Sequence, residues 1–244
     1  YIRLLGYDAK SHSGAASDVD LNQLAVAAGL AWVHNGELVA PYVGVNFGLA
    51  VVTCEIDLAV DQPLAPVESQ PWFKTRGPKW WLGIGFAKNA LNRDPYAKRK
   101  FVDGAHPFER LSRVEKPTTF IDEASVARVP KRTDMFARAQ FGDLGKTIQK
   151  GATGGYYVRK TAPSSAQRRA LGAFVLLQDG EPNKAGLRPK NKKTNSENIK
   201  ASSYFLGVDA VGISRCPDWT WYSHDATGAP ITPPHDQAIS MIID

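Results

Sequence analysis

Cysteine is almost absent from this chain, which has only two, Cys54 and Cys216, among its 244 residues. The two lie far apart, and neither belongs to a Cys-x-x-Cys or histidine-rich motif. The chain alone therefore provides neither a disulfide framework nor a zinc or iron–sulfur site. Two reduced thiols in a cytosol-like compartment are the ordinary interpretation of this pattern.

Long apolar runs are missing as well. No stretch approaches the roughly 18 apolar residues of a membrane-spanning helix, and the opening sequence YIRLLGY lacks the pattern of a secretory signal. The chain opens without Met, in what resembles the end of a helix, so its N-terminus says little about targeting. We expect no transmembrane segment and, from the two reduced thiols, a cytoplasmic location.

Positive charge is concentrated in residues 146–200, where twelve Lys or Arg stand against three Asp or Glu. This gives a local balance of +9, compared with +6 for the whole chain. The densest part, LRPKNKKTNSENIK, has no aromatic residue between its cations. A basic patch can follow a phosphate backbone, but a bare basic run is more often a solvated connection. We therefore expect no nucleic-acid partner. A nucleic-acid affinity that falls steeply as the salt concentration rises would indicate one.

Apolar periodicity and turn residues predict a mixture of helices and strands. A helix over DVDLNQLAVAAGL should begin at Asp18 or Asp20 and end at Gly29, and a preceding strand should start near Ala9. A later strand is expected from about Phe47 to Ile56. Further along, we predict helices over 164–178 and 196–207 and strands over 208–214 and 237–244.

Proline and aromatic residues set residues 65–107 apart, with bursts such as Trp72–Phe73 and Trp80–Trp81. Large aromatic side chains bury much area at low entropic cost, so we interpret this segment as an ordered wrap over a neighbouring surface.

The histidines show no metal-ligand spacing. We expect surface or interface positions for His12, His34 and His106, and turn positions for His224 and His235. The stretch GATGGYYVRK, residues 151–160, lacks the GK[ST] ending of a phosphate-binding loop and is interpreted as a turn followed by two anchoring tyrosines.

Three stretches resemble the corrinoid-dependent reductive dehalogenases. NIKASSYFLGVDAVGISRCPDWTWYS is similar to the helix–strand–turn that opens the family's cobalamin-binding core. FERLSRVEKPTTFIDEASVARVPKRTDMFARAQFGDLG, residues 108–145, resembles the family's N-terminal arm. YIRLLGYDA, LAVAAGLAWVHNGELVAPYVG and DLAVDQPL, all within residues 1–64, resemble a later part of the same core.

The order of these stretches is informative, because a late part of the core precedes the parts that should begin it. This order resembles the self-duplicated catabolic members, in which a degenerate copy precedes the active one. The resemblance implies an α/β (α+β) fold of nitroreductase-like, cobalamin-binding type and an internal portion of a longer enzyme. Residues 1–64 would end the degenerate copy, 65–107 form the wrap, 108–194 form the arm and basic connection, and 195–244 begin the second copy.

The loop HNGELVAPYVG has the shape of an active-site loop without its chemistry. The resemblance places Tyr42, Asn46 and Gly48 where active copies commonly carry a lysine and arginines. A phenol in place of an ammonium removes a cation that would lower a neighbouring tyrosine's pKa. The cluster cysteines expected after Pro63 are also missing, and each cubane cluster needs four thiolates.

Five residues are candidates for a substrate or cobalamin pocket. Periodicity alone makes them packing residues, whereas the resemblance places them near the corrin and substrate cavity, where aromatic walls would stack on a halogenated ring. These residues are Phe136, Phe141, Asp218, Trp219 and Tyr222. Neither a catalytic residue nor a metal ligand is expected in this chain.

The resemblance implies an oxidoreductase that removes halide from an organohalide, such as a halogenated phenol, at a cobalamin cobalt. Two [4Fe–4S] clusters would supply electrons, fed by an electron-donor protein or a fused reductase domain, and a homodimer is possible. A non-catalytic corrinoid-binding or trafficking module of the same fold is the alternative. Cysteine-rich motifs beyond Asp244 would favour the enzyme.

Overall fold

The computed structural model describes residues 1–13, 17–34, 36–41, 43–45, 47–66, 107–116, 121–153 and 180–243. Its elements follow in chain order, with α denoting α-helices, β strands and η 3₁₀ helices. They are β1 (Ala9–Ser13), α1 (Leu21–Ala27), β2 (Trp32–His34), β3 (Glu37–Val39), β4 (Gly48–Cys54), η3 (Pro107–Arg110), η4 (Lys131–Thr133), α4 (Met135–Phe141), α5 (Lys146–Ala152), α8 (Lys192–Phe205), β5 (Ala210–Arg215), η5 (Asp218–Thr220) and β6 (Gln237–Ile243).

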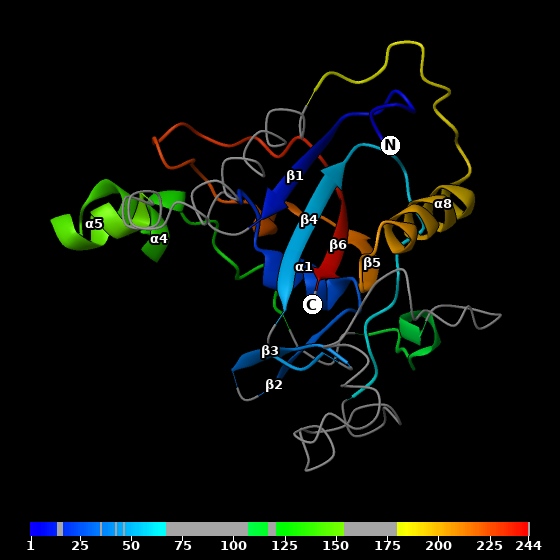
Figure 1. The fold of residues 1–244 in the computed structure, drawn as a ribbon, viewed down its shortest axis with the longest axis horizontal. Helices are drawn as coiled ribbons and strands as arrows, with labels where there is room; N and C mark the ends of the chain where they lie inside the picture. Colours follow the sequence, from blue (N-terminus) through cyan, green and yellow to red (C-terminus); the bar gives the residue numbers. More distant parts are fainter. Residues whose placement is uncertain are drawn as a thin grey trace, which may run out of the picture.

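One four-stranded sheet, in the order β1-β4-β6-β5, forms the centre of the fold (Figure 1). All neighbouring strands in this sheet are antiparallel. Of the two fold classes expected from the sequence, α/β and α+β, the structure therefore has the α+β class. The strand expected at the end of the chain is an inner strand: β6 pairs with β4 over seven residues, from Gly48 opposite Ile243 to Cys54 opposite Gln237. Residues 1–64 and 195–244 therefore contribute neighbouring strands to one sheet.

The two faces of the sheet carry different helices, and Figure 1 shows α1 behind the strands and α8 beside β5. Val51, Ala238 and Leu24 of α1 belong to one buried cluster with Trp221, which is 1% exposed. Ile213, Ile239 and Ile199 of α8 belong to another cluster. Residues of β4 and β6 belong to both clusters, because successive side chains in a strand point to opposite faces.

The helix limits follow from local chemistry. Asp20 caps α1, since its carboxylate accepts the backbone N–H groups of Asn22 at 3.0 Å and Gln23 at 3.2 Å. Gly29, at φ +64°, takes the left-handed conformation that ends this helix. One expectation was wrong: α8 begins at Lys192, so part of the basic run lies in a helix and not in a loop.

A half-buried charged cluster ties three parts of the chain together. Lys200 of α8 forms ion pairs with Asp61 at 2.6 Å and with Glu109 of η3 at 2.9 Å. Tyr204 donates its hydroxyl to the other Glu109 oxygen at 2.7 Å, and Asp61 accepts the N–H of Ile213 on β5 at 2.7 Å. Every carboxylate in this cluster thus has a donor, which is the condition for keeping charge away from water.

We expect Lys200→Met to lower the free energy of unfolding by about 1–3 kcal/mol at pH 7, because Glu109 and Asp61 keep their burial but lose their cation. Burial acts to raise the pKa of Glu109, yet the hydrogen bonds from Lys200 and Tyr204 outweigh it and lower that pKa below the ordinary 4.5. The Glu109 contribution is therefore present above pH 4.5 and disappears as the pH falls through the lowered folded-state pKa.

Urea unfolding at pH 7 and pH 3.5 measures this effect, and the difference between wild type and variant should narrow at the lower pH. Lys193→Met is the matched control. Its side chain is 83% exposed and lies 3.9 Å from Glu197, so its loss should change stability by less than about 0.5 kcal/mol. If Lys200→Met and Lys193→Met lowered the free energy of unfolding equally, the charged cluster would make no specific contribution to stability.

Candidate functional site

The aromatic turn that follows β5, residues 216–224, is held against the segment before α1. Val19 forms a β-bridge with Trp221, and the N–H groups of Asp20 and Tyr222 donate to Thr220 and Asp18 at 2.8 and 3.1 Å. Trp221 is buried, Trp219 and Tyr222 are half-buried, and Asp218 is exposed. The three residues proposed from the sequence thus lie on the outer side of a firmly packed turn.

Residues 121–134 of the arm dock directly on this turn. Arg128 donates to three carbonyl oxygens, those of Trp221 at 3.1 Å, Tyr222 at 2.6 Å and Ile231 at 2.7 Å. Backbone hydrogen bonds from Ser223 to Val129 and from Lys131 to His224 continue the contact. A guanidinium has several fixed donors, so Arg128 can satisfy all three carbonyls at once.

Tyr222 joins the turn to helix α4 through Asp134. One Asp134 oxygen caps α4 by accepting the N–H of Phe136 at 2.7 Å, and the other accepts the Tyr222 hydroxyl at 3.2 Å. Burial and the Asp134 carboxylate raise the pKa of Tyr222 to about 12, so the phenol is protonated at neutral pH and donates this hydrogen bond. Two of the stretches singled out from the sequence therefore meet at one carboxylate.

Lys131 is a site feature that the sequence analysis missed. It is only 6% exposed, its ammonium donates to the carbonyl of Ser17, and it lies 4.7 Å from the centre of the Tyr222 ring. Burial lowers its pKa, while Asp134 and Asp18 oppose that change. A lysine between Pro130 and Arg132 in a polar stretch looks solvated; only the long-range contact with Ser17 reveals its burial.

The phenylalanines of α4 are largely exposed, Phe136 at 64% and Phe141 at 48%. Arg132 lies 4.5 Å above the Phe141 ring and forms a bidentate pair with Asp143 at 2.6 and 2.7 Å. Figure 1 shows α4 and α5 projecting from the sheet. The described residues thus bring Phe136 near Tyr222 through Asp134 but enclose neither phenylalanine in a cavity, and a cavity role for both remains a prediction.

The loop HNGELVAPYVG forms a closed turn in its described part. Ala40 and Gly44 exchange two backbone hydrogen bonds of 2.9 Å around Pro41, and Gly36 and Gly44 have φ of +81° and +85°. Gly48 begins β4 opposite Ile243. Tyr42 and Asn46 lie outside the described residues, as do His106, the predicted helix over 164–178 and most of the wrap.

Two histidine expectations were wrong. His12, expected at a surface or interface, is 2% exposed, and His235, expected in a turn, is 6% exposed and bonded to other side chains. His12 lies in β1 between the half-buried Ser11 and the exposed Ser13, and the alternation of side chains along a strand was the available signal. His34 is exposed, as expected. His224, expected in a turn, is exposed and forms an isolated β-bridge with Pro230.

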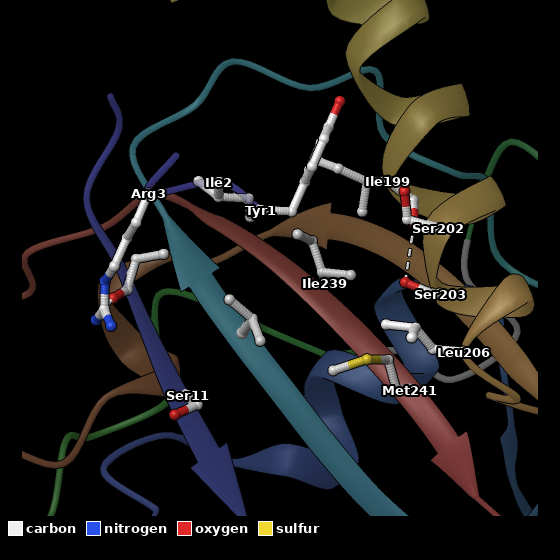
Figure 2. A pocket seen from close by; sticks show the side chains of 12 residues that line it. Tyr1, Ile2, Arg3, Ser11, Ile199, Ser202, Ser203, Leu206, Ile239 and Met241 are labelled. Carbon is white, nitrogen blue, oxygen red and sulfur yellow. Dashed lines mark hydrogen bonds between the residues drawn. The ribbon is translucent and has the colours of Figure 1, made fainter. Parts of the chain in front are cut away.

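A groove of about 250 Å³ lies between α8 and the sheet. Figure 2 shows Ile199, Leu206, Ile239 and Met241 along its apolar wall, with Arg3 at one end. Pockets for drug-sized ligands occupy about 300–1,000 Å³, and a corrinoid is larger than such ligands, so this groove does not fit one.

The two cysteines do not fit an iron–sulfur cluster. Both are buried, and burial raises the pKa of Cys54 to about 12 and that of Cys216 to about 11. Cluster ligands are thiolates, four for each cubane. Within the described ranges, no three His, Cys, Asp or Glu side chains gather closely enough to hold a metal ion. No helix in the described part is long and apolar enough to cross a membrane.

The chain resembles the reductive dehalogenases. Comparison with solved structures confirms the resemblance that its motifs indicated. The solved structures it matches include several of the catabolic reductive dehalogenase NpRdhA. A single-residue variant is 35% identical over 100% of this chain, at a TM-score of 0.48. The complex with 3-bromo-4-hydroxybenzoic acid has the same identity and a TM-score of 0.47.

The chain spans about a third of the length of these proteins, since it covers 35% of each. The TM-scores lie below 0.5, so the superposition itself carries no argument about the fold. No protein-family model matches the chain, and no curated protein matches it.

Proposed function

We propose that this chain is a structural and pocket-forming portion of a reductive dehalogenase that removes halide from a halogenated aromatic molecule. The full enzyme would use a cobalamin and two [4Fe–4S] clusters, bound elsewhere in the longer protein. In this reading the fold is of nitroreductase-like, cobalamin-binding type, with residues 1–64 ending a degenerate copy and residues 195–244 beginning the active one.

The observation that carries the proposal is the meeting of the arm with the aromatic turn. These are two of the stretches whose motifs resemble the family, and Arg128, Asp134 and Lys131 fasten one to the other around Tyr222. The indole N–H of Trp219 is buried and has no hydrogen-bond partner within the described part of the chain. A buried donor of this kind is usually satisfied by a ligand, water or further protein, which supports a pocket beside the turn.

The chain's own contribution would be positional. Protonated Tyr222 and half-buried Trp219 offer an aromatic surface on which a halogenated ring can stack, and the Arg128 contacts keep that surface fixed. Both cysteines are protonated, and the groove of about 250 Å³ is too small for a corrinoid, so we assign no chemical step to the described residues.

The alternative function is a corrinoid-binding or trafficking module without turnover. It is favoured if the longer protein binds corrinoid and lacks both cysteine-rich motifs. For the enzyme, a halogenated small molecule as substrate, an electron-donor protein or fused reductase domain, a cytoplasmic location and a homodimer are parts of the proposal to be tested on the full-length protein.

We expect the isolated 244-residue polypeptide to incorporate no iron–sulfur cluster and to release no halide, because its two thiols are too few and are protonated. Iron and acid-labile sulfide are measured after anaerobic reconstitution, with Cys54→Ser as the matched control. Cluster content should be near zero in both polypeptides. Stoichiometric cluster in the wild type that Cys54→Ser abolishes would contradict the assignment of residues 1–64 to a degenerate copy.

A further inference from the structure

A row of hydrogen-bonded side chains runs from the surface to the base of the aromatic turn. His235 lies 3.0 Å from the half-exposed Asp8 carboxylate, and its other ring nitrogen lies 2.9 Å from the Thr53 hydroxyl. Thr53 in turn lies 2.9 Å from Nε2 of His12. His12 packs edge-on against Trp221 with 5.4 Å between ring centres. The row therefore ends directly beneath the turn that carries Trp219 and Tyr222.

Donors and acceptors fix the form of His12. The backbone N–H of Asp18 donates to His12 Nδ1 at 3.5 Å, so that nitrogen is an acceptor and carries no proton. The proton of a neutral ring is then on Nε2, which donates to the Thr53 hydroxyl. A second proton would go to Nδ1 and place its N–H against the N–H of Asp18, two donors with no acceptor between them. This unfavourable contact would lie beside the apolar cluster of Trp221.

His235 differs from His12 in this respect. A cationic His235 can donate from one nitrogen to Asp8 and from the other to Thr53, because the Thr53 hydroxyl can instead donate to the Lys10 carbonyl at 3.4 Å. Thr53 then accepts from both rings with its two lone pairs. The outer histidine can therefore accept a proton without breaking the row, and the inner one cannot.

The Asp18 segment that His12 holds is also the base of the site. The carbonyl of Asp18 accepts a hydrogen bond from the N–H of Tyr222 at 3.1 Å, and the carbonyl of its neighbour Ser17 accepts one from the buried ammonium of Lys131. If Asp18 moves away from His12, both the aromatic turn and the arm lose an attachment. The charged and titratable groups around the row are Lys10, Asp18, Lys131, Asp8, Glu55, Cys216, Arg215 and Asp236.

We propose that His12 is a pH-sensitive latch: as a neutral ring it holds the Asp18 segment and the aromatic turn in place, and on protonation it releases them. The latch goes beyond the proposed dehalogenase function and does not depend on it. Free histidine titrates near a pKa of about 6.5, so release is favoured progressively below that pH, because the open state binds one more proton.

Hydrogen exchange of the full-length protein tests the latch. The protection of the Asp18 and Tyr222 amides, corrected for intrinsic exchange, should fall by up to about tenfold between pH 6.5 and pH 5.5, the effect of one bound proton per pH unit. His12→Gln, which cannot titrate and retains a donor toward Thr53, should abolish this pH dependence. His34→Gln removes an exposed imidazole and should leave it intact.

Unchanged pH dependence in His12→Gln, or pH-independent protection in the wild type, would overturn the proposal. Imidazole nitrogen NMR of the wild type provides a second measurement that requires no variant. The proposal expects a neutral His12 ring protonated at Nε2 whenever the Asp18 amide is protected. A doubly protonated His12 ring beside a protected Asp18 amide would refute the latch even if His12→Gln failed to fold.

Discussion

Gly212→Ala in the full-length protein should lower the free energy of unfolding by about 3 kcal/mol or more. A Cβ at Gly212 would lie 2.3 Å from the Ala28 carbonyl oxygen, 2.8 Å from the Ala28 Cβ and 2.9 Å from the Leu30 side chain. The end of α1 thus packs on the backbone of β5 with no room for a methyl group. Overpacking of this kind commonly costs about 1–3 kcal/mol, and contact with backbone atoms brings the cost to the upper end or beyond.

Gly180→Ala is the matched control, because a Cβ there would meet nothing within 4 Å and its φ is not positive. Thermal unfolding of both variants gives the comparison. A melting temperature for Gly212→Ala equal to that of Gly180→Ala would mean that α1 does not lie on β5. The joining of residues 1–64 with residues 195–244 into one packed unit would then be wrong.

Local signals in the sequence predicted most of the elements around this contact. The Asp20 cap, the apolar spacing of Leu21, Leu24 and Ala25, and Gly29 were sufficient to place α1. The strands β4, β5 and β6 were readable as apolar runs bounded by turn residues. These features depend on neighbours within a few positions, which is the range over which a sequence pattern is informative.

The pairing of β4 with β6 was not predictable in this way, because almost two hundred residues separate Gly48 from Ile243. Either strand is apolar enough to pair with several partners, and only the complete sheet selects one. The same reason applies to the site: nothing in their own segments distinguishes Asp134 and Lys131, and Tyr222 was a candidate only through the family resemblance. They become a site only when Arg128 brings the arm onto the turn.

Tyr222→Ala in the reconstituted full-length protein should reduce halide release by tenfold or more while corrinoid content stays near one per chain. Removal of the ring takes away the stacking surface and the bond to Asp134 that holds α4 against the turn. The loss of one pocket contact worth about 1.4 kcal/mol or more in the transition state corresponds to a tenfold loss of rate. Trp219→Ala should act in the same direction.

Tyr7→Ala provides the matched control for lost packing. Tyr7 also lies beneath a cation, Arg188 at 5.5 Å, and donates its hydroxyl to Pro189 at 3.0 Å, but it belongs to the α8 side of the sheet. Both tyrosine variants should lower the melting temperature. Only Tyr222→Ala should lower the halide release of the protein that remains folded.

The most direct test of the central claim is halide release from a halogenated phenol by the full-length protein, measured with corrinoid content in the same samples. We predict halide release by the wild type and by Tyr7→Ala, and a loss of tenfold or more in Tyr222→Ala and Trp219→Ala with corrinoid retained. Loss of corrinoid in parallel with activity would make these residues structural. No halide release from a wild-type protein that holds its corrinoid and both clusters would contradict the proposed function itself.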